Sequence, residues 1–320
     1  MVAVQLDQQL EVVEHPLPEV ASNEALIKVS LVGICNTDIE LVKGYMGFRG
    51  ILGHEFVGVV QECAAREWLG KRVVGEINLA CHQCEWCHRG LQRHCPNRRV
   101  LGILNKDGAM AEYVTLPVSN LHRVPDHVAD EAAVFTEPLA AACEIAEQIH
   151  LVPGMSALII GDGKLGLLIA QVLNKYGCEV ELLGKHAQKL EIAQQAGVAT
   201  TARQRKREKY DLVVEATGAG AALPLAIEKV RPRGFLVLKS TYAGQVEIDL
   251  APLVIDEIQL IGSRCGPFAP ALKILTREEI DTTALISGRM PLSQAIDGFR
   301  LAQQPGVLKV LLDAENRQNR

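Results

Sequence analysis

The sequence predicts two domains, one rich in β-strands and one in which strands and helices alternate around a parallel sheet. The chain has 320 residues, and single hydrophobic cores stop growing near roughly 250 residues. Residues 1 to about 135 contain short β-type runs, such as 25–32 and 56–61, separated by glycines, which is typical of a barrel or sandwich. From Ser156 onward, strands alternate with apolar-periodic helices, which predicts a doubly wound parallel sheet with crossover helices.

The elements of the second part follow from this alternation. After the strand that begins at Ser156, the pattern predicts helices at 164–176, 187–195, 221–230 and 292–303, and strands at 179–183, 211–215, 234–239, 258–263 and 307–312. Residues 258–263 are also expected to form a sheet edge that pairs between subunits of a homodimer or homotetramer.

Composition excludes several functional classes. The 33 basic and 38 acidic side chains give a net charge of −5, so no broad positive field attracts nucleic acid. No apolar run approaches the roughly 20 residues of a membrane-spanning helix. The amino-terminal residues lack the pattern of a secretory signal, so we expect a cytoplasmic protein with a small-molecule substrate.

A glycine-rich turn predicts a dinucleotide site. Gly161, Gly163 and Gly166 form G-x-G-x-x-G directly after a predicted strand, with Lys164 and Leu165 opening the next helix. In such a turn the first glycine permits a tight bend, the second lets the backbone approach the pyrophosphate, and the third lets the helix pack on the sheet. The unpaired N–H groups and the dipole at the amino terminus of the helix then favour binding of the phosphates.

The end of the second strand of this unit bears on the choice of cofactor. A fold that selects NAD normally places an acidic residue there, about 20 residues after the glycines, to bind the ribose 2′-hydroxyl. This sequence has Gly184, Lys185 and His186 instead, which leaves room and positive charge for a 2′-phosphate. We therefore expect NADP rather than NAD, with a tolerant NAD pocket as the alternative.

Two sets of residues are candidate zinc ligands. Four cysteines lie within fifteen residues, and four thiolates complete a tetrahedral zinc site of the structural type: Cys81, Cys84, Cys87 and Cys95. The second set is dispersed and combines one sulfur, one nitrogen and one oxygen donor, from Cys35, His54 and Glu137. This mixed set suits a catalytic zinc with an open fourth position. Two zinc ions per chain are therefore predicted.

These motifs, in this order, resemble the medium-chain dehydrogenase/reductase family, specifically its zinc-dependent alcohol and polyol dehydrogenases. The resemblance covers nearly the whole chain and includes Gly33-Ile34-Cys35-x-Thr37-Asp38, Gly53-His54-Glu55, the four-cysteine lobe, Glu137-Pro138-Leu139, the glycine turn, Glu215-Ala216-Thr217-Gly218 and Lys309. It implies a catalytic domain built on a chaperonin-10-like β-barrel, at 1–138, with the structural zinc lobe at about 78–98. A Rossmann cofactor domain at 139–265 and a return to the catalytic domain at 266–320 complete the expected arrangement.

The resemblance also implies roles for individual residues. Cys35 and His54 correspond to zinc ligands, and Glu137 stands where the family uses either cysteine or glutamate. Near the metal, Glu55 is matched to an acid that can approach the ion, and Asp38 to the residue that orients the histidine ligand. In the proton relay, Thr37 passes on the substrate proton, and Glu40 replaces a histidine. On the cofactor side, Thr217 belongs to the binding site and Lys309 reaches the pyrophosphate.

The implied reaction transfers a hydride between an alcohol or polyol, or the matching aldehyde or ketone, and a nicotinamide cofactor, with zinc as Lewis acid. Two alternatives are a zinc-free quinone or enoyl reductase of the same fold and a nucleotide-binding protein without catalysis. Zinc content and turnover distinguish the three.

Overall fold

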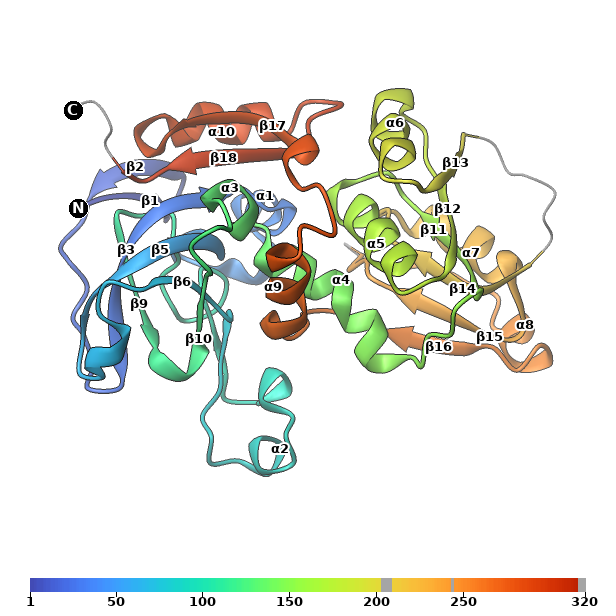
Figure 1. Cartoon of the computed structure of the whole chain (residues 1–320), viewed down its shortest axis with the longest axis horizontal. Helices are drawn as coiled ribbons and strands as arrows, with labels where there is room; N and C mark the ends of the chain where they lie inside the picture. The colour runs from blue at the N-terminus through green and yellow to red at the C-terminus, as the bar shows by residue number, and fades with distance from the viewer. Residues whose placement is uncertain (203–208, 243–244, 316–320) are drawn as a thin grey trace. The chain divides into compact units, whose positions relative to one another are not determined.

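The computed structural model describes residues 1–202, 209–242 and 245–315 (Figure 1). Within it the chain divides into two compact units, of which the first comprises Met1–Glu137, Ala271–Arg277 and Ile286–Arg320 and the second comprises Pro138–Pro270 and Glu278–Leu285. Each unit has its own sheets and core. Among the described residues, no helix combines the length and apolar character needed to cross a bilayer.

The first unit is built mainly of antiparallel strands. A seven-stranded sheet has the order β10-β6-β5-β3-β18-β17, with β9 also pairing β3, and a second sheet has the order β2-β1-β4. Its strands are β1 (Val2–Leu6), β2 (Leu10–Glu14), β3 (Glu24–Gly33), β4 (Gly50–Ile51), β5 (Glu55–Cys63), β6 (Arg72–Gly75), β7 (Asn78–Leu79), β8 (Arg99–Val100), β9 (Tyr113–Pro117), β10 (Leu121–Arg123), β17 (Ile286–Pro291) and β18 (Lys309–Asp313). Because β18 pairs antiparallel with β3, the carboxyl-terminal segment returns to the sheet built by the amino-terminal one.

Short helices and one lobe complete the first unit. The helices are α1 (Asn36–Val42), α2 (Glu85–His88), α3 (Asp130–Ala133), the part of α9 (Phe268–Thr276) that begins at Ala271, and α10 (Ala295–Ala302). The two-stranded ribbon β7–β8 and α2 form a lobe that projects from the sheet (Figure 1). The helix α9 was not predicted from the sequence.

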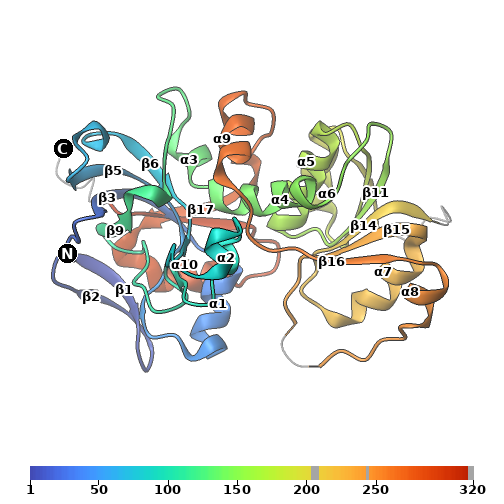
Figure 2. The ribbon, with the colours of Figure 1, turned by 90° about the horizontal axis from the view of Figure 1, so that it is seen from below.

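The second unit is a doubly wound parallel sheet. Its strand order is β13-β12-β11-β14-β15-β16, and all five pairings are parallel. The strands are β11 (Ser156–Ile160), β12 (Glu179–Leu183), β13 (Ala199–Thr201), β14 (Tyr210–Glu215), β15 (Val230–Leu238) and β16 (Gln259–Gly262), and the helices are the part of α4 (Thr136–Gln148) that begins at Pro138, α5 (Lys164–Lys175), α6 (Ala187–Gln195), α7 (Leu223–Lys229) and α8 (Ala251–Ile255). Helices α5 and α6 cover one face of the sheet, and α7 and α8 cover the other (Figure 2).

The central strands are anchored at their amino ends by a polar cluster. Asp211 accepts hydrogen bonds from the backbone N–H of Ser156 at 2.9 Å, from its hydroxyl at 2.6 Å and from Arg231 Nε at 2.5 Å. Burial raises the pKa of Asp211, but the hydrogen bonds from Ser156 and Arg231 outweigh burial and bring it down to about 2. The ionised carboxylate therefore links β11 to β14 at the amino ends of the strands, whereas the glycine turn lies at their carboxyl ends.

Candidate active site

Three potential metal ligands converge in the first unit. Cys35 follows β3 and caps α1, whereas His54 directly precedes β5 and Glu55 begins it. The register of β3 and β5 pairs Gly33 with Glu55, which brings the two segments together. One sulfur of Cys35, one ring nitrogen of His54 and one oxygen of Glu55 all lie within 4.8 Å of one another.

Asp38 holds Cys35 in place and lies against the ring of His54. Its Oδ2 accepts the backbone N–H of Cys35 at 2.8 Å, and its Oδ1 lies 3.3 Å from His54 Nδ1, too poorly aligned for a hydrogen bond. Because Nδ1 faces Asp38, the other ring nitrogen of His54 is available as a ligand. Burial lowers the pKa of His54, but the negative charges of Asp38 and Cys35 raise it well above its ordinary value.

A buried ion pair lies beside the cluster. Lys309 and Glu55 are each 1% exposed, and Lys309 Nζ binds Glu55 Oε2. The other carboxylate oxygen, Oε1, is buried and has no hydrogen-bond partner among the described residues. Gly33 makes room for the pair, because a Cβ there would lie 2.6 Å from Glu55 Oε2. An unpartnered buried oxygen beside a thiol and an imidazole fits a zinc ion as its ligand.

Three more residues were predicted for this site. Thr37 and Glu40 lie on α1, and Glu137 lies at the start of α4. Thr37 Oγ1 lies 3.7 Å from Cys35 Sγ, and Glu40 Oε1 lies 3.0 Å from Lys43 Nζ at the surface. Glu137 is the second residue of α4 and is partly buried. It is not a member of the three-residue cluster, in which the oxygen donor is Glu55. The assignment of Glu137 as a ligand stays a prediction.

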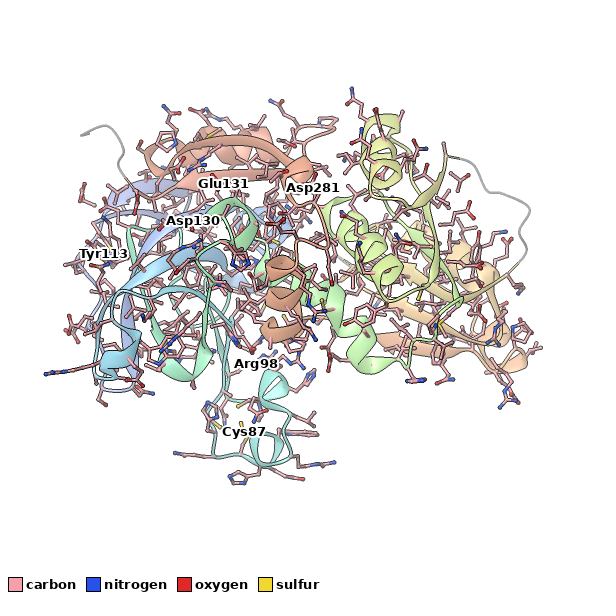
Figure 3. The ribbon with its side chains drawn as sticks, in the orientation of Figure 1. Cys87, Arg98, Tyr113, Asp130, Glu131 and Asp281 are labelled. Carbon is pink, nitrogen blue, oxygen red and sulfur yellow. The ribbon has the colours of Figure 1, made fainter. Side chains whose placement is uncertain are left out.

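The four cysteines of the lobe form a second cluster, in which Figure 3 labels Cys87. All four are free thiols. The sulfur of Cys84 lies 3.5 Å from that of Cys87 and 3.8 Å from that of Cys95, and the sulfurs of Cys95 and Cys81 are 3.5 Å apart. A tetrahedral zinc with Zn–S bonds of about 2.3 Å places its sulfurs about 3.8 Å apart. The lobe therefore fits a closed zinc site of the structural type.

Replacement of Cys95 with serine is expected to remove one of the two predicted zinc ions and to unfold the lobe, because a structural zinc contributes its binding free energy to local folding. Metal analysis should fall from about two to about one zinc per chain, and limited proteolysis should cut within 78–98. Cys63→Ser is the matched control, since Cys63 is a free thiol outside both clusters. Retention of both zinc ions by Cys95→Ser would contradict the assignment.

The glycine turn lies between β11 and α5 in the second unit. Gly161 has φ of +121°, and a Cβ on Gly166 would lie 2.0 Å from the carbonyl oxygen of Gly161, so the helix packs directly on the turn. At Gly163, the N-cap of α5, a Cβ would meet nothing within 4 Å. An open glycine at a helix amino terminus fits a dinucleotide diphosphate. Lys164 and Leu165 are the first two residues of α5, as predicted.

The structure also places an acidic residue where sequence reasoning found none. Gly184 directly follows β12, and a Cβ there would lie 2.6 Å from both Cβ and Oδ2 of Asp162. Asp162 is the variable residue between the first two glycines of the turn, so the motif gave it no role. The signal available in the sequence was the combination of an acid in the turn with a glycine at the strand end.

Thr217 lies after β14, at the carboxyl end of the parallel strands. Its backbone N–H and hydroxyl both bind Glu215 Oε1, at 2.7 Å and 2.5 Å. The other oxygen of Glu215 accepts the hydroxyl of Tyr242 at 2.5 Å. Ligands of open parallel sheets bind outside the carboxyl ends of the strands, so Thr217 is at the expected edge of the sheet.

Comparisons with known proteins agree with this geometry. Residues 21–126 match the family of the alcohol dehydrogenase GroES-like domain, and residues 165–277 match the zinc-binding dehydrogenase family. The chain is 30% identical over 326 residues to D-altritol 5-dehydrogenase of Agrobacterium fabrum, covering 94% of this chain and 96% of the relative.

Two solved structures share the whole fold. A zinc-binding dehydrogenase from Sinorhizobium meliloti bound to NADP has a TM-score of 0.91, 28% identity and 98% coverage of both chains. An alcohol dehydrogenase from E. coli complexed with NADH has a TM-score of 0.91, 25% identity and coverage of 98% of this chain and 99% of that one.

The fold and the sites define a zinc-type dehydrogenase with a nicotinamide cofactor. The chain belongs to the zinc-dependent alcohol and polyol dehydrogenases of the medium-chain dehydrogenase/reductase family. The predicted combination of a GroES-like domain with a Rossmann domain is thereby confirmed, and so is the predicted class, an NAD(P)-dependent oxidoreductase of alcohols or polyols.

Proposed function

We propose that the chain binds two zinc ions, one held by the lobe and one at the Cys35 cluster, and oxidises an alcohol or polyol to the matching carbonyl compound, or the reverse. The observation that carries this proposal is the cluster of Cys35, His54 and Glu55, in which a buried carboxylate oxygen has no hydrogen-bond partner among the described residues. Cys81, Cys84, Cys87 and Cys95 would hold the second ion.

At the Cys35 cluster, a bound zinc ion would act as a Lewis acid toward the oxygen of the alcohol or carbonyl group. Asp38 fixes Cys35 through its backbone N–H. The Thr37 hydroxyl, 3.7 Å from Cys35 Sγ, is the group that passes the substrate proton. Glu40, paired with Lys43 at the surface, receives a proton from the relay through water.

The cofactor side of the reaction is assigned to the second unit. The turn of Gly161, Gly163 and Gly166 would hold the dinucleotide diphosphate, and Thr217 would line the site at the carboxyl end of β14. Lys309 was predicted to reach the pyrophosphate, and in the structure its ammonium group binds Glu55. A role for Lys309 at the cofactor remains a proposal.

Metal analysis and a substrate panel test the proposed function. We expect about two zinc ions per chain and turnover of secondary alcohols or polyols when NAD and NADP are supplied separately. Fewer zinc ions with full activity would favour a zinc-free quinone or enoyl reductase. Dinucleotide binding without turnover of any alcohol, polyol or aldehyde would favour a protein that binds nucleotides without catalysis.

We also propose domains at 1–138, 139–265 and 266–320 and a cytosolic location. Nine cysteines, all free thiols, support a reducing compartment, because oxidising compartments pair such residues as disulfides.

A homodimer or homotetramer is the proposed assembly. Strand β16 is an edge of the parallel sheet, and it carries Leu260, which is 45% exposed, while Val254 and Ile255 of α8 are 76% and 77% exposed. Exposed apolar side chains beside an open strand edge are typical of a subunit interface. Leu260→Lys is expected to shift the chain toward the monomer in light scattering, whereas the control Leu17→Lys, at another exposed leucine, should not. An unchanged mass for Leu260→Lys would contradict this interface.

A further inference from the structure

Asp162 occupies the position next to Gly184 that an acidic side chain at the end of β12 would otherwise fill. A Cβ on Gly184 would lie 2.6 Å from Asp162 Oδ2. The Asp162 carboxylate therefore fills the space that a side chain at position 184 would need. In Rossmann folds the residue at this position recognises the 2′ position of the adenosine ribose. The acid that the strand lacks is therefore present, and it comes from the glycine turn.

Hydrogen bonds fix the Asp162 carboxylate at this place. Its Oδ2 accepts the backbone N–H groups of Lys185 at 2.6 Å and His186 at 2.8 Å, and His186 Nδ1 lies 3.0 Å away. The Asp162 side chain is only 10% exposed. Burial raises the pKa of Asp162, but the N–H groups of His186 and Lys185 outweigh burial and lower it, so the group is ionised at neutral pH.

This arrangement changes the meaning of Gly184, Lys185 and His186. The sequence suggested that they accommodate a 2′-phosphate, which needs N–H donors and positive charge. In the structure, the backbone donors of Lys185 and His186 already bind Asp162, and the imidazole of His186 lies against the same carboxylate. A phosphate dianion at this point would meet a fixed negative charge, whereas a ribose hydroxyl would meet a hydrogen-bond acceptor.

We propose that Asp162 is the residue that selects the cofactor, and that it selects NAD over NADP by accepting the ribose hydroxyls and repelling a 2′-phosphate. This proposal rests on the proposed dinucleotide site at the glycine turn. It reverses the NADP preference that we expected from the sequence. It also explains Gly184, since any larger residue there would collide with Asp162.

Direct binding tests the proposal without relying on turnover. The dissociation constants of NADH and NADPH are measured for the zinc-loaded chain by the fluorescence of the reduced nicotinamide. We expect NADH to bind at least about tenfold more tightly, as one charge-assisted hydrogen bond implies. Asp162→Asn keeps the shape and removes the charge, and it should reduce the ratio of the two constants about tenfold.

A second variant separates cofactor selection from a purely structural role. Asp162→Ala should lose the preference for NADH. The double variant Asp162→Gly/Gly184→Asp, which removes the Cβ that a side chain at position 184 would meet at 2.6 Å, should restore the preference by returning the acid to the strand end. Asp211→Asn is the matched control, because Asp211 also binds backbone N–H at a strand but at the opposite edge of the sheet. Asp211→Asn should lower the stability of the chain and leave the ratio of the NADPH and NADH dissociation constants unchanged.

The outcomes are distinct. Tighter binding of NADPH by the unaltered chain, or an unchanged ratio in both Asp162→Asn and Asp162→Ala, would overturn the role of Asp162. Equal weakening of NADH and NADPH by these variants would likewise assign Asp162 to structure alone and overturn the proposal. If the unaltered chain bound neither dinucleotide, the proposed function itself would fail.

Discussion

Cys35→Ser is expected to lower kcat by at least about 10³, because loss of a Lewis acid that supplies several kcal/mol of transition-state stabilisation has an effect of this size. Zinc content should fall from about two to about one per chain. The dissociation constant of NADH should change little, because the proposed dinucleotide site lies in the second unit, whereas Cys35 lies in the first. Steady-state kinetics, metal analysis and NADH fluorescence provide the three measurements.

Two comparisons make this prediction specific. Cys63→Ser changes a free thiol outside both clusters and should leave zinc content and kcat intact. Asp38→Asn should weaken zinc binding about 10- to 100-fold rather than abolish it, because Asp38 acts on the ligands and is not one of them. Full turnover by Cys35→Ser would disprove the assignment of this cluster to catalysis.

The same metal measurement decides between the two candidate oxygen ligands. Glu55 belongs to the cluster of converging donor atoms, whereas Glu137 was predicted from the family resemblance. If Glu55 completes the ligand set, Glu55→Gln should lose the zinc of this site and Glu137→Gln should keep it. The opposite result would restore the predicted set of Cys35, His54 and Glu137.

The second unit was the part of the fold that the sequence predicted most closely. The predicted strand 179–183 and helix 187–195 coincide with β12 and α6, because a buried parallel strand followed by an amphipathic helix has a strong local pattern. Helix α9 was missed, and it contains a proline near its start, which local rules treat as a break. The antiparallel pairing of β18 with β3 joins segments about 280 residues apart, with Leu311 opposite Gly33, so no local pattern could specify it.

The candidate site was predictable where donor types and spacing carried the information. The four cysteines are close in sequence, and the structure brings their sulfurs together. The pairing of Glu55 with Lys309 spans 254 positions, and neither residue identifies its partner by spacing. Asp162 was missed for a different reason, since a motif defined by its glycines assigns no role to the residue between them. In both cases the missing information was a contact formed only after folding.

The buried pair itself leads to the second large prediction. Lys309→Met should destabilise the zinc-free protein by about 3–5 kcal/mol, because without zinc and without Lys309 the carboxylate of Glu55 is buried with no cation beside it. Both side chains are 1% exposed, so water cannot replace the lost partner. The free energy of unfolding of the full chain, from urea denaturation followed by circular dichroism, measures the effect.

A double variant and a matched lysine show whether the pair is the cause. In Glu55→Gln/Lys309→Met the uncompensated charge is removed, so the loss should be smaller than the sum of the single losses by about 1–3 kcal/mol. Lys229 is the control: its side chain is 11% exposed, but its partner Glu228 is 64% exposed. Lys229→Met should therefore cost about 1 kcal/mol or less. Equal destabilisation by Lys229→Met and Lys309→Met would mean that lost packing of the lysine chain, rather than the buried charge of Glu55, accounts for the effect.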